Sequence, residues 1–331
     1  MRKAVWLWQG LRVAVEAEDP VLEAVASRFR LLPRAGEGGR PDLQIVFRPV
    51  NPAELARLEG EIPELGWTVL PLLGHPVRYS PGHQRLRLGL PGRFLAACHL
   101  ATGRLDAAYV GSEGDPSWFL SHPPVTLALH EIAKQQGRYM VHAAAVAEGG
   151  RGVLLAGASG SGKTTLALAL VRAGFGFLGD DLTFLTRGPS GWRALAFPDA
   201  VDVTPGTARF FPEIAARAGD PAAWSRPKRE VCVGQVFGIE PVWECEPVAL
   251  VFPRARAGAG TRLAPLGKAE ALEELLVNVL RTEAEATQRH LDALAGLVRQ
   301  VSCYRMETGL DFDLQAARIR ALLQSPAGRA G

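Results

Sequence analysis

Hydrophobic residues follow two different patterns along the chain. In Arg85–Leu90 they occupy every second position, as in a strand that exposes one face to water. Gly152–Ala156 is a short apolar run, which is typical of a strand buried on both faces. Leu166–Val171 follows a glycine-rich segment and consists of good helix formers. Together these patterns predict a mixed α/β protein.

The first 122 residues are predicted to form a smaller α/β or α+β domain of their own. Gly111–Pro116 and Pro123-Pro124 are typical of a domain boundary. The second domain then covers residues 123–324, and residues 325–331 form a disordered tail. We expect the first domain to recognise a substrate or partner, because it contains no catalytic constellation. Its predicted features are a helix over Val21–Leu32, a loop over Gly36–Pro41, a strand over Leu43–Phe47, and surface histidines at His75, His83 and His99.

Several elements are predicted in the second domain around the glycine-rich segment. A long helical pattern from Lys268 to Val301 carries an apolar stripe, which indicates core packing or the subunit contact of a homo-oligomer. The stripe consists of Leu272, Leu275, Leu276, Val279 and Leu280. The other predictions are a helix over Val125–Gln136, a hairpin turn at Gly188–Gly191, a strand over Pro247–Phe252 and a last helix over Asp313–Leu323.

Composition narrows the class of protein. The 331 residues are 47% hydrophobic and 21% charged, and the net charge of +3 predicts no affinity for nucleic acid or anionic membrane. No apolar stretch approaches about 18 residues, and the run Ala4–Trp8 is too short for a signal peptide, so the cytoplasm is expected. The four cysteines show no metal-ligand spacing and are predicted to lie in the core.

The strongest motif is the nine-residue segment Gly157–Thr165. It matches G-x-x-x-x-G-K-[ST] between a predicted strand and a predicted helix, which is the context that the motif requires. Its glycines allow backbone N–H groups to point at the phosphates of ATP, Lys163 adds a charge, and Thr164 is a ligand for Mg²⁺. The predicted ATP-binding residues are Gly157, Ser159, Gly160, Ser161, Gly162, Lys163, Thr164 and Thr165.

Two adjacent acids follow the next predicted strand. Phe175–Leu178 is strand-like, and Asp180 and Asp181 come directly after Gly179. Ligands of open α/β sheets bind at the carboxyl ends of strands, so both carboxylates are expected beside the glycine-rich loop. A catalytic base and a ligand for Mg²⁺ would account for such a pair.

A histidine is predicted at the mouth of the same loop. Gly149-Gly150 is typical of a hairpin turn, so residues whose numbers sum to about 299 should face each other. His142 then lies opposite Gly157, where an imidazole can contact a phosphate or a catalytic carboxylate.

Lys228 is a further candidate, from a basic segment over Trp224–Glu230. It is one of only five lysines among 37 basic residues. Its charge, assisted by Arg226 or Arg229, would stabilise a phosphoryl group during transfer. A solvated turn is the alternative for this segment.

The spacing of His142, the loop Gly157–Thr164 and Gly179-Asp180-Asp181 resembles the HPr kinase/phosphorylase superfamily, and its HPr-kinase-related branch in particular. That branch includes tailoring kinases of lasso peptides. The resemblance implies the P-loop kinase fold shared with phosphoenolpyruvate carboxykinase and ATP-dependent phosphorylation of a serine-type hydroxyl. It also implies that Asp180 is the base, Asp181 its acidic neighbour with Mg²⁺, and His142 a supporting residue.

One part of the family pattern is missing. HPr kinases proper have an Arg-Gly signature after the paired aspartates, whereas Phe197–Gly206 contains no such pair. HPr as substrate and reversal by inorganic phosphate are therefore not predicted. The expected acceptor is a hydroxyl on a peptide, a protein or a small molecule. A P-loop ATPase or GTPase switch and a non-catalytic nucleotide-binding protein are the alternatives, and the absence of N-K-x-D favours ATP.

Overall fold

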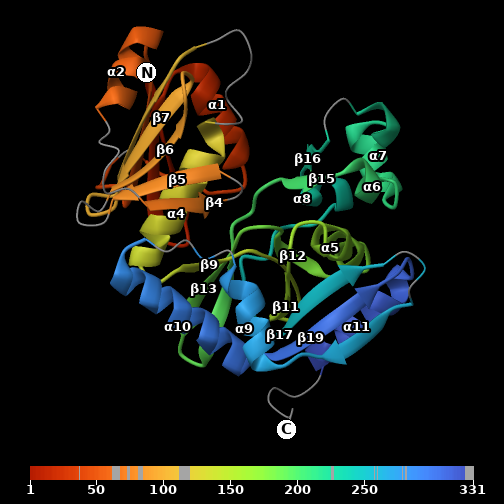
Figure 1. The fold of residues 1–331 in the computed structure, drawn as a ribbon. Coiled ribbons are helices and arrows are strands. Elements are labelled where there is room, and N and C mark those ends of the chain that lie inside the picture. The colour runs from red at the N-terminus through yellow and green to blue at the C-terminus, as the bar shows by residue number, and fades with distance from the viewer. Residues whose placement is uncertain are drawn as a thin grey trace. The chain divides into compact units, whose positions relative to one another are not determined.

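The structure is a computed structural model of the 331-residue chain. It describes residues 1–324 except 37, 62–67, 73–74, 81–84, 112–119, 225–226, 257, 259, 278 and 280–281, and in β4 and β5 it describes the backbone alone. The predicted tail, Leu280, Arg226 and His83 therefore lie outside the described residues. The contacts divide the chain into two compact units, residues 1–138 with 280–289 and residues 139–279 with 290–331 (Figure 1).

The first unit contains an eight-stranded sheet in the order β1-β2-β3-β8-β7-β6-β5-β4. The strands predicted at Leu43 and Arg85 are confirmed as β3 and β6. The predicted helix begins at Asp19 and ends at Arg28, earlier than expected. The bounds are β1 Arg2–Trp8, β2 Leu11–Ala17, α1 Asp19–Arg28, β3 Leu43–Pro49, α2 Pro52–Gly60, β4 Thr68–Leu72, β5 His75–Ser80, β6 Arg85–Leu90, β7 Phe94–His99, β8 Arg104–Tyr109 and α4 Pro123–Gln135.

Helices lie on both faces of this sheet, and α2 contacts β7 on the face opposite α4, where Leu55 packs with Leu95 and Ala108. α1 contacts β1 and β2, and α4 contacts β3 and β8. Alternate strand residues such as Val13, Val15, Ile45 and Phe47 are buried, and Val46 between the last two is half-buried. α4 was predicted to begin the second domain. The contacts instead divide the chain after Arg138, because α4 packs on the first sheet.

The second unit contains a nine-stranded sheet in the order β12-β10-β11-β17-β14-β13-β9, with β19 beside β17 and β18 beside β19. A separate pair, β15 and β16, lies between β14 and β17 in sequence. The bounds are β9 Tyr139–Val141, β10 Ala143–Glu148, β11 Arg151–Ala156, α5 Lys163–Arg172, β12 Gly176–Gly179, β13 Thr183–Gly188, β14 Gly191–Ala196, β15 Val201–Val203, α6 Pro205–Ala208, α7 Pro212–Ala218, η1 Pro221–Ala223, β16 Arg229–Val231, α8 Val233–Phe237, β17 Glu244–Ala255, β18 Arg262–Pro265, α9 Lys268–Leu276, α10 Ala284–Gln300, β19 Ser302–Thr308 and α11 Phe312–Gln324.

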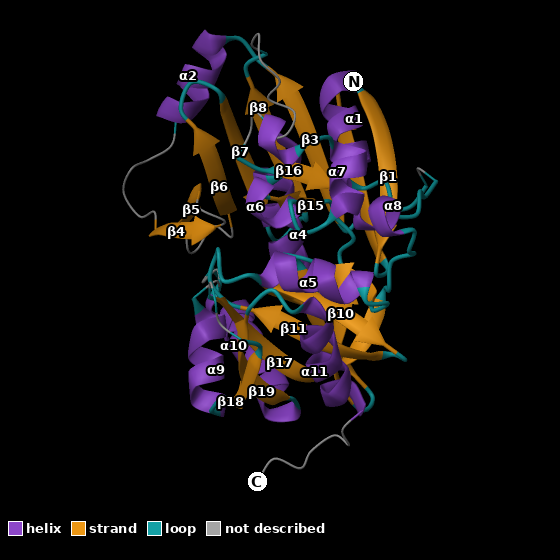
Figure 2. Ribbon diagram, turned by 90° about the vertical axis from the view of Figure 1, so that its right-hand side faces the viewer, coloured by secondary structure: helices purple, strands orange, loops and turns teal. Residues whose placement is uncertain are grey.

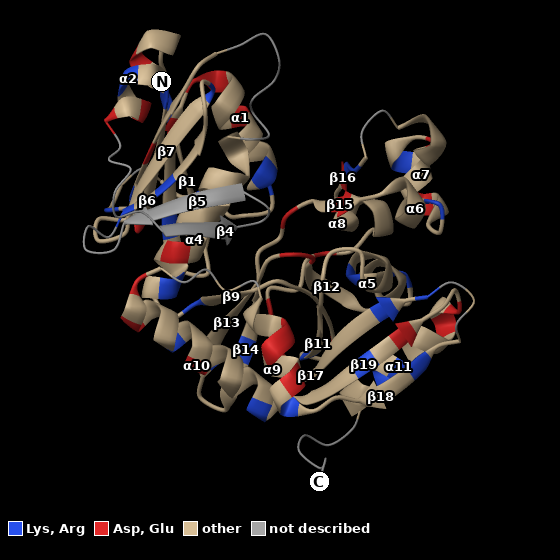
Figure 3. Cartoon of the chain, viewed as in Figure 1, with Lys and Arg blue, Asp and Glu red and all other residues tan. Residues whose placement is uncertain are grey.

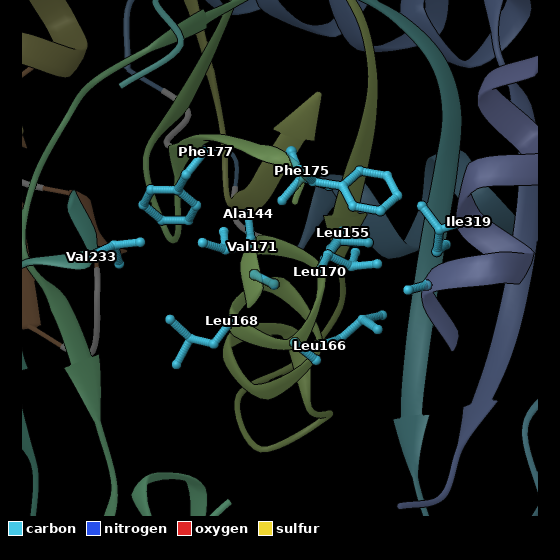
Figure 4. Close-up of a cluster of buried hydrophobic side chains, with 14 of the residues drawn as sticks. Ala144, Leu155, Leu166, Leu168, Leu170, Val171, Phe175, Phe177, Val233 and Ile319 are labelled. Carbon is cyan, nitrogen blue, oxygen red and sulfur yellow. The ribbon is translucent and has the colours of Figure 1, made fainter. Parts of the chain in front are cut away.

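Both faces of this sheet are buried, which explains the wholly apolar strand patterns. Val153 and Leu155 of β11 point to one side, where they join the residues of α5 and α11 shown in Figure 4. Leu154 points to the other side and joins residues of α9 and α10. Figure 2 shows α5 beside β10 and β11, the strands that it contacts. The three-layer arrangement fixes the start of α5 against the carboxyl end of β11.

The helix predicted from Lys268 to Val301 is two helices. α9 ends at Leu276 and α10 begins at Ala284. The carboxylate of Glu283 accepts hydrogen bonds from the backbone N–H groups of Glu285 and Ala286, which starts α10 as a separate helix. Leu275 is buried in the core and Leu272, Leu276 and Val279 pack against it, so these members of the stripe serve core packing.

The four cysteines are unpaired. Cys98, Cys245 and Cys303 are buried as predicted, and Cys232 is half-buried. None of the helices in the described residues combines the length and apolar character needed to cross a membrane.

Candidate functional site

The glycine-rich loop joins β11 to α5, as the motif requires. Gly157, Gly160 and Gly162 have φ values of 138°, 80° and 101°, which lie in the left-handed region that favours glycine. At position 162, a Cβ would also lie 3.3 Å from the Cβ of Ala255. The loop therefore turns tightly into α5, whose first turn has N–H groups without intrahelical acceptors. Such a helix start attracts anions.

Lys163 is the first residue of α5 and is only 5% exposed. Its ammonium donates hydrogen bonds to the carbonyl oxygens of Gly157 at 2.8 Å and Ala158 at 3.2 Å. A buried lysine that is bonded only to carbonyl oxygens keeps an unneutralised charge inside the loop. That charge suits an anion at the centre of the loop.

The register predicted for His142 is confirmed. Ala143 pairs with Ala156 in the β10–β11 hairpin, so the next position along each strand is His142 and Gly157. His142 is the single residue between β9 and β10. There the chain passes from one section of the sheet to the other.

The segment Asp180–Leu182 makes the same passage in the opposite direction. It joins β12, which pairs with β10, to β13, which pairs with β9. Ala145 pairs with Gly179 and Val141 pairs with Thr183, so the two passages lie side by side. The fold thus brings His142 and the two aspartates together at the carboxyl end of β11.

Asp180 bonds directly to the start of α5. The hydroxyl of Thr164 donates a hydrogen bond of 2.7 Å to Oδ2 of Asp180. Oδ1 of Asp180 is also buried but has no hydrogen-bond partner among the described residues. A buried carboxylate oxygen without a donor costs free energy unless a ligand or a proton satisfies it.

The environment of Asp180 favours its protonated form. Burial, followed by the nearby charge of Asp181, raises the pKa of Asp180 to about 7. The hydrogen bond from Thr164 and the positive charges of Lys163 and Lys228 oppose this rise. An aspartate with a pKa near neutrality can exchange a proton at neutral pH.

Asp181 differs from Asp180 in exposure and in partner. Its side chain is 48% exposed, and its Oδ1 lies 3.6 Å from Nε2 of His142. Burial lowers the pKa of His142, while Asp181 acts in the opposite direction. Nδ1 of His142 is buried and lacks a partner among the described residues. The two adjacent acids therefore have different surroundings.

Lys228 lies on the same side of the unit. Its ammonium is 3.8 Å from Oδ2 of Asp202 in β15, and its positive charge lowers the pKa of both Asp180 and His142. Arg229, which was expected to assist, is directed elsewhere: it donates to the carbonyl of Ala218 and lies over the ring of Trp224.

Asp202 is a member of the site that was not predicted from the sequence. Burial raises the pKa of Asp202, Lys228 opposes this, and the charges of Asp181 and Asp199 add to it. The acid in the apolar run Val201-Asp202-Val203 could have indicated this residue, because a strand acid next to two buried valines needs a partner.

Thr165 has a role that the motif does not give it. Its hydroxyl lies 2.9 Å from that of Thr207 in α6. This contact ties the first turn of α5 to the segment that carries β15, and thus positions Asp202 relative to the loop.

The oxygen atoms in this region fit Mg²⁺, which prefers carboxylate and hydroxyl ligands. The unpartnered Oδ1 of Asp180, the hydroxyl of Thr164 and the exposed carboxylate of Asp181 are of this kind. The predicted pair of ligands was Thr164 with Asp181. In the structure the hydroxyl of Thr164 bonds to Asp180, so Asp180 joins Thr164 and Asp181 among the candidate ligands.

Comparison with known proteins adds little. No protein-family model matches the sequence, and no curated protein matches it. Among solved structures, the chain is similar to the HPr(Ser) kinase/phosphatase from Coxiella burnetii, at 13% identity and a TM-score of 0.30 over 55% of this chain and 96% of that one. A TM-score this low carries no argument for a shared activity. The function rests on the chain's own residues.

Proposed function

We propose that the protein is an ATP-dependent kinase that transfers the γ-phosphoryl group to a hydroxyl acceptor. One observation carries the proposal: Asp180, a buried aspartate with an unpartnered Oδ1, is bonded to Thr164 at the start of a helix that follows a glycine-rich loop. The loop is suited to phosphates, and the aspartate is suited to a metal or a proton. A kinase needs both functions within a few ångströms.

In this proposal the residues position the reactants and balance charge. The loop amides and Lys163 bind the phosphates, while Thr164, Asp181 and the free oxygen of Asp180 are available to Mg²⁺. When bound, Mg²⁺ neutralises the charge of the phosphates. Asp180 accepts the proton of the acceptor hydroxyl, and its raised pKa suits that role.

His142 and Lys228 complete the proposed site. Burial keeps the imidazole of His142 neutral, so Nε2 can bond to Asp181 and orient that carboxylate. Lys228 is half-exposed and is held by Asp202. An ammonium at this place would stabilise negative charge on the transferred group.

The acceptor is proposed as a hydroxyl group of the serine type on a peptide, protein or metabolite. Two other functions use the same loop. An ATPase or GTPase switch would transfer the group to water, and a binding protein would not transfer it. Asp180 favours the kinase, because a buried group with a pKa near 7 is costly in a site that only binds nucleotide.

The test is transfer of label from γ-labelled ATP to fractions of the source cell's extract. The kinase should label one or more acceptors in a bond stable to acid and labile to alkali, as expected for a serine phosphate. The Asp180→Asn variant should not label them. Release of all label as inorganic phosphate in every fraction would instead establish the ATPase.

A further inference from the structure

The carboxyl ends of β17 and β19 adjoin the glycine-rich loop on the side away from Asp180. The sheet order places β10 and then β12, which ends just before Asp180, on one side of β11, and it places β17 and β19 on the other. Because β11, β17 and β19 are parallel, their carboxyl ends share one edge, where ligands of such sheets bind. The backbone N–H of Ala255, the last residue of β17, donates a 3.0 Å hydrogen bond to the carbonyl oxygen of Ser161. This bond joins the loop to β17.

The position of Asp180 gives a bound nucleotide a direction. The proposed reaction requires the γ-phosphoryl group beside Asp180, so the nucleoside at the other end of the phosphate chain extends towards β17 and β19. The helices around α5 separate the same two sides. Figure 4 shows Val233 of α8 and Ile319 of α11 on opposite sides of α5. α8 follows Lys228 in the sequence, whereas α11 begins just after β19.

Thr308 ends β19 beside the loop. It pairs in register with Ala255, and its Oγ1 lies 3.7 Å from the position that a Cβ at Gly162 would take. Thr308 is only 8% exposed, yet its hydroxyl makes no hydrogen bond to any residue that the structure describes. A hydroxyl can both donate and accept a hydrogen bond. The side chain of Thr308 is therefore suited to a ribose hydroxyl next to the phosphate loop.

Leu310 lies on a turn that hydrogen bonds hold in place. The carbonyl oxygen of Gly309 accepts a 3.0 Å bond from Nε2 of Gln315, whose side chain is buried. The backbone N–H of Phe312 donates to the carbonyl oxygen of Leu310 at 3.1 Å. The side chain of Leu310 is nevertheless 71% exposed, and it is two residues, at most about 7 Å along the chain, from Thr308. It offers an apolar surface for the flat face of a base.

Arg256 is the first residue after β17 and is held beside Thr308. Its backbone N–H donates a 3.2 Å hydrogen bond to the carbonyl oxygen of Thr308. Its guanidinium is 63% exposed and lies 3.5 Å from a carboxylate oxygen of Glu307. Figure 3 colours the basic and acidic residues of β17 and β19 blue and red. An ion pair uses the N–H edge of a guanidinium, so its planar face is still available to stack on an aromatic ring.

We propose that Leu310, Arg256 and Thr308 form the nucleoside subsite of the kinase. The base packs on Leu310 and on the guanidinium plane of Arg256, and the hydroxyl of Thr308 bonds to a hydroxyl of the ribose. The ground between these residues and the loop is low, because Gly162 has no side chain and its neighbour Ala255 has only a methyl group. The inference rests on the proposed function, since Asp180 fixes where the γ-phosphoryl group lies.

The test is calorimetry with two probes, ATP and inorganic triphosphate, each with Mg²⁺. The double variant Thr308→Val/Leu310→Ala leaves the charge of the site unchanged. It should bind ATP at least tenfold more weakly and triphosphate with less than a twofold change. Arg256→Lys keeps the positive charge but loses the planar group, so it should weaken ATP binding at least threefold and leave triphosphate binding unchanged. Val277→Ala removes an equally exposed apolar side chain after α9 and should change neither affinity.

Two results would overturn the subsite alone. Unchanged ATP binding in both variants would place the nucleoside elsewhere. An equal loss for ATP and triphosphate would show that these residues only support the shape of the loop. A wild-type protein that binds neither probe would instead overturn the proposed function, and the subsite with it. Circular dichroism checks the fold of each variant, and none of these measurements depends on phosphoryl transfer.

Discussion

The hydroxyl of Thr164 donates a 2.7 Å hydrogen bond to Oδ2 of Asp180, and this contact joins the glycine-rich loop to the first of the paired aspartates. Asp181, the next residue, is instead half-exposed beside His142. The two carboxylates are adjacent in sequence but differ in burial and partner, and burial raises the pKa of Asp180 to about 7. Their substitutions should therefore have different effects.

We expect Asp180→Asn to retain ATP binding and to lower phosphoryl transfer by about 10²–10⁴-fold. The amide oxygen can still accept the bond from Thr164, but the side chain cannot take a proton at neutral pH, and general base catalysis is worth about that factor. Steady-state kinetics with the identified acceptor measures kcat, and calorimetry measures the Kd for ATP. Asp313→Asn, at an exposed position in α11, is the control.

Asp181→Asn should raise the concentration of Mg²⁺ needed for half-maximal activity more than Asp180→Asn does at saturating ATP. The carboxylate of Asp181 is exposed to solvent and supplies a charge that a hard cation prefers. Titration with Mg²⁺ at fixed ATP distinguishes the two variants. Full activity in both would rule out the mechanism proposed for the pair.

Counting residues was enough to predict the position of His142. A two-residue turn at Gly149-Gly150 fixes the register of the hairpin, and the pairing of Ala143 with Ala156 confirms it. The hydrogen bond from Thr164 to Asp180 could not be predicted by counting residues. It depends on how Asp180–Leu182 passes between two sections of the sheet, which involves strands distant in sequence.

Long-range contacts also explain what the patterns missed. Asp202 faces Lys228 because β15 and β16 pair across a stretch of small helices, and no local pattern indicates that pairing. The break between α9 and α10 is fixed by a cap at Glu283, whose carboxylate accepts bonds from the first backbone N–H groups of α10. The apolar pattern of the sequence has helical periodicity on both sides of this break, so it predicted a single helix.

Lys163→Ala should weaken ATP binding by about 10–100-fold. A hydrogen bond to a charged group contributes about 1.5–3 kcal/mol, and the loss of that free energy corresponds to this change in Kd. The ammonium is buried in the loop, so no other described lysine can replace it. Calorimetry with ATP and Mg²⁺ measures the loss. Lys3→Ala, on the surface of the first unit, should leave the Kd unchanged, and an unchanged Kd in both variants would disprove the phosphate-binding role.

Lys228→Ala should lower kcat by at least tenfold and change the Kd for ATP little. The ammonium of Lys228 lies beside Asp202, and its charge lowers the pKa of both Asp180 and His142. Its ion pair is half-exposed, so the free energy of unfolding should change by less than about 0.5 kcal/mol. Arg229→Ala is the neighbouring control, since Arg229 is directed to Ala218. An equal loss of kcat in both variants would indicate a general effect of the β16 segment.

The last prediction concerns a fully buried ion cluster in the first unit. Lys134 lies 2.7 Å from Oε1 of Glu131, His130 lies 2.9 Å from the same oxygen, and Thr282 donates to Oε2 of Glu131 at 2.6 Å. Burial opposes the ionisation of Glu131, but Lys134 and His130 outweigh it and lower the pKa of Glu131 to about 2. The cluster links α4 to the segment that begins α10.

Because the folded pKa of Glu131 is below its ordinary value of 4.5, its contribution to stability is complete above pH 4.5. It should decrease as the pH falls from 4.5 towards 2. Hydrogen exchange of peptides from α4 should show a loss of a few kcal/mol in the free energy of opening across this range. At pH 7, Glu131→Gln should already be less stable by about 3–5 kcal/mol, because it leaves Lys134 charged and buried without its carboxylate.

In Glu131→Gln the opening free energy of α4 should also depend less on pH between 4.5 and 2, because the titrating carboxylate is gone. Only the pH dependence due to His130 and the other titratable groups is left. Glu23→Gln, at an exposed position in α1, is the matched control and should keep both the stability and its dependence on pH. If the opening free energy of α4 in wild type is flat between pH 5 and 3, Glu131 does not titrate with a lowered pKa. The cluster would then hold the segment around Thr282 by hydrogen bonds alone, and the loss in Glu131→Gln would be smaller than that of a broken ion pair.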